Sequence, residues 1–99
     1  MELGEFTINI PGDDEEPHFI RVKIFLAYGD RDLTLQAELS KRRIQIKDSI
    51  NKIIKRKTKK QLDAPEVIDN LKIELREVIN QFLQSGNIKD VYFESITVM

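Results

Sequence analysis

The sequence predicts an α+β domain, a small three-stranded sheet in the order β-β-α-α-β with a long helix and a second helix packed on one face. Apolar and polar residues alternate near both ends of the chain, as they do in strands. In the middle of the chain, apolar residues recur at the spacing of amphipathic helices. The chain has 99 residues and no cysteine, so we expect residues 1–99 to form a single domain without disulfides.

Two strands are predicted in the first third of the chain. Residues 6–10 alternate between apolar and polar side chains, and the turn-forming sequence Pro11–Asp14 ends this strand. The second strand, His18–Tyr28, has an apolar face on its even-numbered positions. Its odd-numbered positions also become apolar at Phe25 and Ala27, which predicts that the second half of this strand is covered on both faces.

A long helix is predicted from Leu33 to Lys57, with Asp30 or Asp32 as its N-cap. Its apolar residues form one stripe at helical spacing: Leu35, Leu39, Ile46, Ile50, Ile53 and Ile54. Arg42 falls within this stripe and is a local misfit. Ile44 falls on the opposite side, among basic residues.

Two further helix-start signals follow. Thr58–Gln61 has the pattern of a capping box and predicts a short helical turn. Asp63–Glu66 repeats that pattern with a proline in the first turn, and it predicts a helix that runs to about Gln84 and is ended by Gly86. The apolar stripe of this helix comprises Ile68, Leu71, Leu75, Val78, Ile79 and Phe82. Ile73 lies off the stripe.

The last element is predicted to be a strand over Ile88–Met99. Apolar side chains occur at both odd and even positions in this segment. This pattern predicts a strand that is central in its sheet or covered by a partner.

Charge is distributed in blocks along the chain, although the net charge is only −1. Residues 1–20 carry six acids and no lysine or arginine, whereas residues 41–60 carry ten bases and one acid, Asp48. Residues 61–99 are acidic again. The basic segment is either a solvated helix face or an electrostatic contact with an anion or with the acidic face of another copy. Within it, Asp48 and Lys52 have the spacing of an ion pair on a helix.

No motif for catalysis, metal binding or cofactor binding is present, so we predict a protein that is not an enzyme and has no cofactor. The single histidine, His18, lies beside an acidic loop and is expected to be a surface residue. The acidic run Asp13–Glu16 lacks the ligand spacing of a calcium loop and is expected to be solvated. The segment 41–60 has no aromatic residue and the sequence pI is about 5.8, which makes nucleic-acid binding a minor alternative.

Several segments resemble the flagellar basal body-associated FliL family in order and spacing across the whole chain. Leu3–Ile10 and Phe19–Ile24 resemble the family's opening strands. The pattern of the family's long helix and the turn after it is similar to Ala37–Leu39, Ile46–Ile50, Lys57–Thr58 and Gln61–Leu62. The end of the chain, Ile79–Asn80, Leu83 and Gly86–Phe93, is similar to the family's terminal signature.

The resemblance implies a non-enzymatic component of the bacterial flagellar motor. Members of this family carry one membrane helix and a domain on the periplasmic side of the inner membrane, similar in fold to stomatin and prohibitin domains. This chain matches only that domain, so the resemblance implies a fragment that lacks the N-terminal membrane anchor. It further implies a ring-forming homo-oligomer that supports the stator units of the flagellar basal body, with the periplasmic part of the stator B subunit as a partner.

The residues expected to contact another copy or the stator are Arg42, Arg43, Ile44 and Lys47, together with the off-stripe Ile73. A ring needs two different faces that complement each other, and a basic helix with acidic surfaces elsewhere supplies them. Family members often have proline or leucine where Arg43 and Ile44 stand, so this neighbourhood departs from the family's pattern. The alternative function is a generic binding module that uses the basic helix 41–60 on an anionic partner, either nucleic acid or a phospholipid surface.

Overall fold

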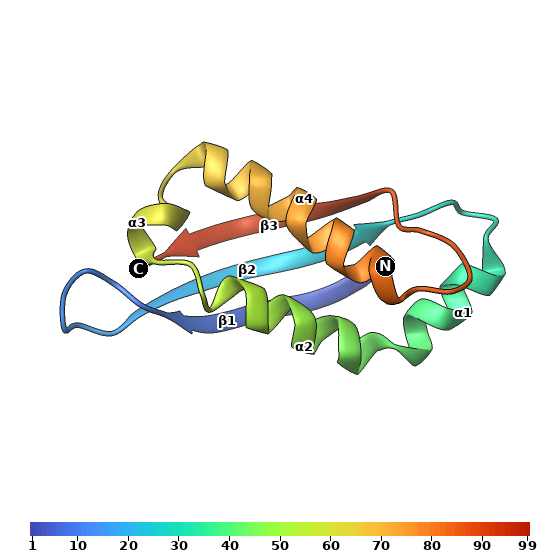
Figure 1. The fold of residues 1–99 in the computed structure, drawn as a ribbon, viewed down its shortest axis with the longest axis horizontal. Helices are drawn as coiled ribbons and strands as arrows, with labels where there is room; N and C mark the ends of the chain where they lie inside the picture. Colours follow the sequence, from blue (N-terminus) through green and yellow to red (C-terminus); the bar gives the residue numbers. More distant parts are fainter.

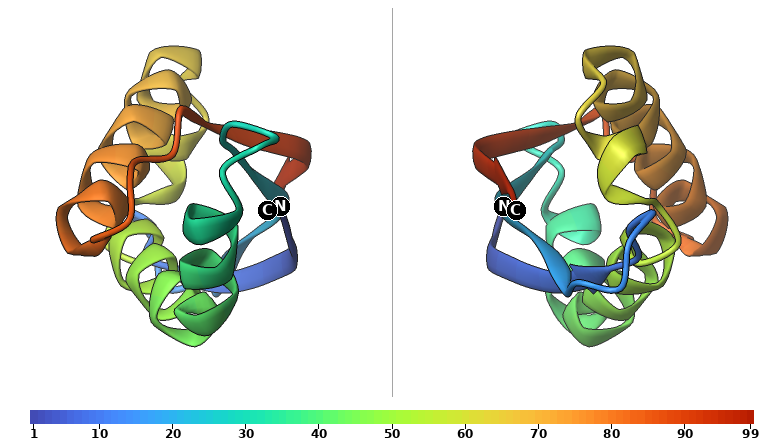
Figure 2. Two further views of the ribbon diagram at one scale, coloured as in Figure 1. Left: turned by 90° about the vertical axis from the view of Figure 1, so that its right-hand side faces the viewer. Right: turned by 90° about the vertical axis from the view of Figure 1, so that its left-hand side faces the viewer.

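The computed structural model describes all residues, 1–99, and has the predicted α+β fold. Strands β1 (Glu2–Ile10), β2 (His18–Ala27) and β3 (Asp90–Val98) form an antiparallel sheet in the order β1-β2-β3. Between β2 and β3 the chain forms helices α1 (Leu33–Lys41), α2 (Arg43–Ile54), α3 (Lys59–Leu62) and α4 (Pro65–Phe82). Figures 1 and 2 show the helices on one face of the sheet, with the other face open. The predicted fold class is therefore confirmed.

The core lies between the sheet and the helices. All 20 buried residues are apolar, and no buried side-chain polar atom lacks a hydrogen-bond partner. The alternation in β2 places its even-numbered residues toward the helices, as predicted. The predicted stripe of the long helix is entirely buried, and the predicted stripe of α4 is buried or half-buried. Burial of these two stripes against one sheet face is the main stabilising term of the fold.

The first strand begins at Glu2, four residues earlier than the alternation predicts. A bulge shifts the register between Glu2 and Gly4, and Gly4 has a φ of 90°. Because the bulge places Leu3 and Phe6 on the same, buried face, the apolar pattern is out of phase there. For this reason the alternation of apolar and polar residues predicted the strand only from Phe6 onward.

β3 is an edge strand, so the predicted central position is wrong, and its alternative, cover by a partner, stays a prediction. The prediction that the second half of β2 is covered on both faces is wrong for this chain, in which nothing covers the outer face of β2 (Figure 2). On that face Phe25 lies between Glu2 of β1 and Tyr92 of β3. The Nζ atom of Lys23 lies 5.9 Å from the centre of the Phe25 ring, so a basic side chain shields part of its apolar surface.

The predicted single helix 33–57 is two helices that meet at Arg42. Arg42 has φ −96° and ψ 14°, outside helical geometry, and α2 begins at the next residue. The hydrogen bonds from Arg42 N to Glu38 O and from Ile46 N to Arg42 O are both 2.9 Å, so the chain bends there without losing its backbone pairing. The misfit in the apolar stripe thus coincides with the bend.

The helix-start signals are confirmed except for the last one. Asp32, not Asp30, caps α1 by accepting a hydrogen bond from Leu35 N at 3.0 Å. Thr58 and Gln61 form the predicted reciprocal capping box. The N-cap of α4 is Ala64 and not Asp63, although Pro65 occupies its first turn as predicted. Asp63 instead ends α3, where its carboxylate binds Lys59 Nζ at 3.0 Å.

Candidate partner-contact surface

The outward side of α2 presents an isolated apolar residue among bases. Ile44 is 85% exposed, in the first turn of the helix. It shares this side with Lys47, Asp48, Lys52 and Lys55, which follow it at one-turn intervals or nearly so. We call these five residues the α2 outer face. The buried isoleucines of α2 lie on the opposite side, so the α2 outer face points away from the core.

The five residues predicted to contact a partner do not form one patch. Arg43 and Lys47 both contact β1, and Ile44 is exposed beside them. Arg43 Nη1 donates a hydrogen bond to the carbonyl oxygen of Glu2 at 3.0 Å. Lys47 Nζ lies 5.6 Å from the centre of the ring of the buried Phe6.

Arg42 and Ile73 are separate from this group. Arg42 turns toward α4, where its guanidinium lies 5.9 Å from the centre of the Phe82 ring, and it donates to Glu38 Oε2 at 2.7 Å. Arg42 is thus engaged inside the chain. Ile73 is 45% exposed and lies on a different helix, α4.

Part of the basic segment is neutralised within the chain. Asp48 pairs with Lys52 at 3.0 Å, as the spacing predicts, and Glu74 pairs with Lys57 at 3.1 Å. The bases of residues 41–60 that have no carboxylate partner within 4 Å are Lys41, Arg43, Lys47, Lys55, Arg56 and Lys60. These cations leave the helical side with an excess of positive charge that is free to meet an anionic surface.

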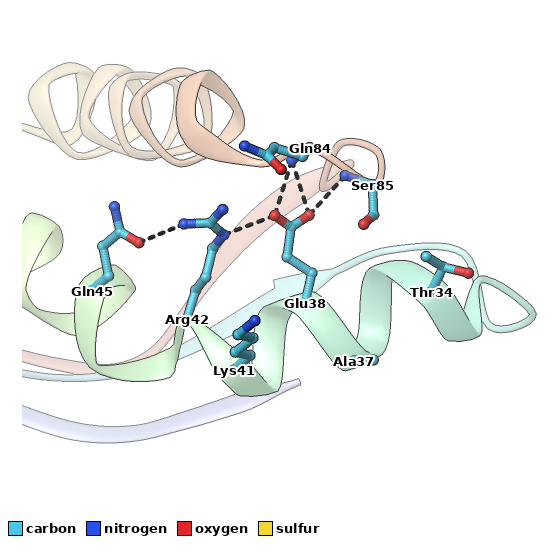
Figure 3. Close-up of a pocket in the computed structure, with 8 residues that line it drawn as sticks. All are labelled: Thr34, Ala37, Glu38, Lys41, Arg42, Gln45, Gln84 and Ser85. Atoms are coloured by element: carbon cyan, nitrogen blue, oxygen red, sulfur yellow. Dashed lines mark hydrogen bonds and ion pairs between the residues drawn. The ribbon is translucent and has the colours of Figure 1, made fainter.

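A carboxylate that the sequence reasoning missed joins α1 to the loop before β3. Glu38 lines an open hollow of about 630 Å³, in which seven of the eight lining residues are not hydrophobic (Figure 3). Its carboxylate accepts hydrogen bonds from the backbone N–H groups of Ser85 at 2.8 Å and Gln84 at 3.0 Å, and from Arg42 Nε at 2.7 Å. Only its spacing to Arg42 was visible in the sequence, because the other two donors lie 46 and 47 residues away.

These hydrogen bonds dominate the chemistry of Glu38. The backbone N–H of Ser85, followed by that of Gln84 and the guanidinium of Arg42, lowers the pKa of Glu38 to about 2. A carboxylate so well satisfied is a poor proton acceptor near neutral pH. Glu38 therefore has a structural role, because its hydrogen bonds hold α1 to the loop before β3. The polar residues that line the hollow are suited to polar contacts.

His18 is not the simple surface residue that the sequence predicted. Its side chain is only 12% exposed, and both ring nitrogens have partners, Asp14 and the carbonyl oxygen of Met99. No group of three or more histidine, cysteine or acidic side chains is arranged to hold a metal ion. None of the helices has the length and apolar composition required to cross a membrane.

Comparison with known proteins identifies relatives over almost the whole chain. The family model of the flagellar basal body-associated protein FliL matches residues 1–98. The flagellar protein FliL of Aquifex aeolicus is 32% identical over 93 residues, which are 94% of this chain and 56% of that protein. The FliL proteins of Treponema pallidum and Bacillus subtilis are 36% and 30% identical over 87% and 99% of this chain, and over 47% and 66% of their own lengths.

The chain therefore spans about half to two thirds of the length of these relatives. The match runs through both outer strands and all the helices. It agrees with the resemblance that the sequence segments indicated. The chain belongs to the FliL family of flagellar basal body-associated proteins.

Proposed function

We propose that this chain is the single periplasmic domain of a membrane-anchored protein that assembles as a ring around the flagellar stator units and supports torque generation. In this proposal the domain carries out no catalysis, and its fold is stomatin-like. Its partners are further copies of itself and the stator B subunit. Family membership supports the flagellar part of the proposal. The observation that supports a contact function is the α2 outer face, on which Ile44 is 85% exposed.

A ring requires a heterologous contact, in which one face of each subunit meets a different face of the next. The α2 outer face lies on the helical side of the molecule, and the open sheet face lies on the other side (Figure 2). The sheet face carries Glu2 and Glu5 along β1, each more than half exposed, and they pair there with Lys23 at 3.2 Å and Arg21 at 3.8 Å. A basic surface and a surface of mixed charge on different sides of one subunit supply the two different faces that head-to-tail assembly requires.

Ile44 and Lys47 contribute differently to such a contact. Complete burial of an isoleucine side chain contributes about 1.5–3 kcal/mol, which makes Ile44 the anchor of the surface. Lys47 and the unpaired Lys55 contribute mainly to the rate of encounter and to orientation, since charges at the rim of an interface act on steering more than on affinity. Ile73 on α4 is a second, weaker apolar contact in this proposal.

The test introduces Ile44→Ala together with Lys47→Glu into the full-length, membrane-anchored protein and images the motor in swimming cells. We expect loss of rings and reduced swimming at unchanged protein level. The matched control is Lys60→Glu, the same charge reversal at an exposed, unpaired lysine on α3. Intact rings and normal swimming in the double variant, at wild-type protein level, would refute the proposed surface.

The alternative proposal is a generic binding module. The unpaired cations Lys41, Lys55, Arg56 and Lys60 favour an anionic partner such as nucleic acid or a phospholipid surface. Binding of this kind falls steeply with salt. A titration against duplex DNA and against anionic vesicles at about 50 mM salt tests it, and no measurable binding under these conditions excludes it.

A further inference from the structure

The imidazole of His18 lies between two hydrogen-bond acceptors at the end of the molecule where the β1–β2 loop turns. Its Nε2 atom is 2.7 Å from Asp14 Oδ1, in that loop, and its Nδ1 atom is 3.0 Å from the carbonyl oxygen of Met99. The ring packs closely on Gly12, where a side chain would overlap it. One side chain thus joins the acidic loop to the residue that follows β3.

Neither partner of the ring can donate a proton in its ordinary state near neutral pH. A carboxylate and a carbonyl oxygen only accept hydrogen bonds, and a neutral imidazole has one N–H. The neutral ring can therefore satisfy one of its two partners, whereas the imidazolium donates to both. The geometry therefore favours the protonated form.

We propose that protonated His18 is a pH-sensitive clasp that holds the β1–β2 loop, residues 11–17, against the end of β3. When the proton leaves, one of the two hydrogen bonds is lost. Met99 stays paired with β2 through the backbone hydrogen bonds from Met99 N to Phe19 O at 2.9 Å and from Phe19 N to Met99 O at 3.3 Å, so the segment that is released is the loop. The loop carries the acidic residues Asp13, Asp14, Glu15 and Glu16. The position of this charge cluster therefore depends on the protonation of one histidine.

The surrounding charges act in both directions. Asp13, Asp14 and Asp63 line the same small hollow as His18, and Lys59 and Lys60 of α3 line it as well. The hydrogen bond to Asp14, followed by that to Met99, raises the pKa of His18 above its ordinary value, whereas desolvation and then the charge of Lys59 oppose this rise. The same pairing lowers the pKa of Asp14, so its carboxylate stays ionised as an acceptor.

The sign of the effect follows from linkage. A histidine whose pKa is raised in the folded state contributes stability that is fully present below its unfolded pKa of about 6.5. That contribution is lost as the pH rises through the folded pKa, which lies above 6.5. The clasp is therefore closed below a pH of about 6.5 and opens as the pH rises through the folded pKa.

The test is an NMR titration of the 99-residue chain made with a C-terminal amide, so that Met99 has a carbonyl oxygen and no terminal carboxylate beside the ring; His18 is its only histidine, and the ring signals are unambiguous. We expect a pKa above 6.5, and we expect the amide signals of residues 13–16 and of Met99 to shift with the same midpoint. Asp14→Asn should lower the pKa of His18. Gly12→Ala should displace the ring and also lower that pKa.

Two controls make the result specific. Asp48→Asn removes a similar ion-paired carboxylate, on α2, and should leave the pKa of His18 unchanged. His18→Gln should abolish the titration of the loop amides. The proposal is overturned if the pKa of His18 is at or below 6.5, if Asp14→Asn leaves it unchanged, or if the loop amides titrate equally in His18→Gln.

Discussion

Variants of two isoleucines on α2, Ile44 and Ile46, distinguish the contribution of this helix to folding from its proposed contribution to partner contacts. Ile46 is completely buried and Ile44 is 85% exposed, although they lie two residues apart in the same helix. Replacing either isoleucine by alanine removes the same atoms and changes the intrinsic helix propensity by nearly the same amount in both variants. Any difference between the two variants therefore reports the environment of the side chain.

The expected magnitudes differ by several fold. Ile46→Ala leaves a cavity in a core that contains no polar group, and we expect a loss of about 2–5 kcal/mol in the free energy of unfolding. Ile44→Ala should change that free energy by no more than about 0.5 kcal/mol, as at other surface positions. With a urea m-value of about 1–2 kcal/mol/M, Ile46→Ala should lower the unfolding midpoint by about 1–5 M.

The assay is urea unfolding of both variants, followed by far-UV circular dichroism. Equal midpoints for Ile44→Ala and Ile46→Ala would refute the assignment of the buried and exposed sides of α2. A large stability loss in Ile44→Ala would show that this residue belongs to the core of the domain, and it would remove the main argument for a contact surface there.

Three further predictions concern local features of the fold. Because the pKa of Glu38 is lowered to about 2, its contribution to stability should be present above pH 4.5 and be lost as the pH falls from 4.5 through 2. Thermal melts should show that Glu38→Gln is less stable than the unmodified chain at pH 7 and that its stability depends less on pH in acid. Identical acid profiles for the two proteins would contradict this prediction. Thr58→Ala removes the capping box of α3 and should cost about 1 kcal/mol in denaturant unfolding, whereas no change would mean that the cap is not formed in solution. Gly4→Ala forces a side chain into a φ of 90° at a bulge with open space around it, so strain alone should cost about 1–3 kcal/mol, and a neutral result would argue against the bulge.

The sequence was sufficient for the parts of the fold that depend on periodicity. Apolar residues recur at a fixed spacing over several positions of β2 and over two or more turns of α2 and α4. A single residue that departs from the pattern therefore does not change the prediction of which face is buried. The capping boxes depend on fewer residues. The pattern at Thr58–Gln61 is confirmed, while the similar pattern at Asp63–Glu66 is displaced by one residue because Asp63 already ends α3 and binds Lys59.

Features that depend on contacts distant in the chain were not predictable. The bend at Arg42 goes together with contacts to Glu38 and Phe82, and nothing in the local sequence shows that Phe82 will lie there. His18 is 81 residues from its partner Met99, so it was expected to be an ordinary surface residue.

The candidate surface was predicted in part. Whether a residue lies opposite the apolar stripe of its helix can be read from the local sequence, and this position correctly indicated that Ile44 is exposed. Neighbouring positions on a helix do not show which way long side chains turn. For that reason Arg42, which binds Glu38 inside the chain, was grouped with residues that point outward.

The most direct measurement of the contact surface is site-specific crosslinking in swimming cells. The chain has no cysteine, so a single cysteine at Ile44 in a cysteine-free full-length protein reports only contacts at that position. A matched control is a single cysteine at Asp69, an exposed position on α4. We predict a crosslinked product from position 44 that contains a second copy or the stator B subunit, and no such product from position 69. The absence of any product from position 44, or equal products from both positions, would contradict the proposed surface.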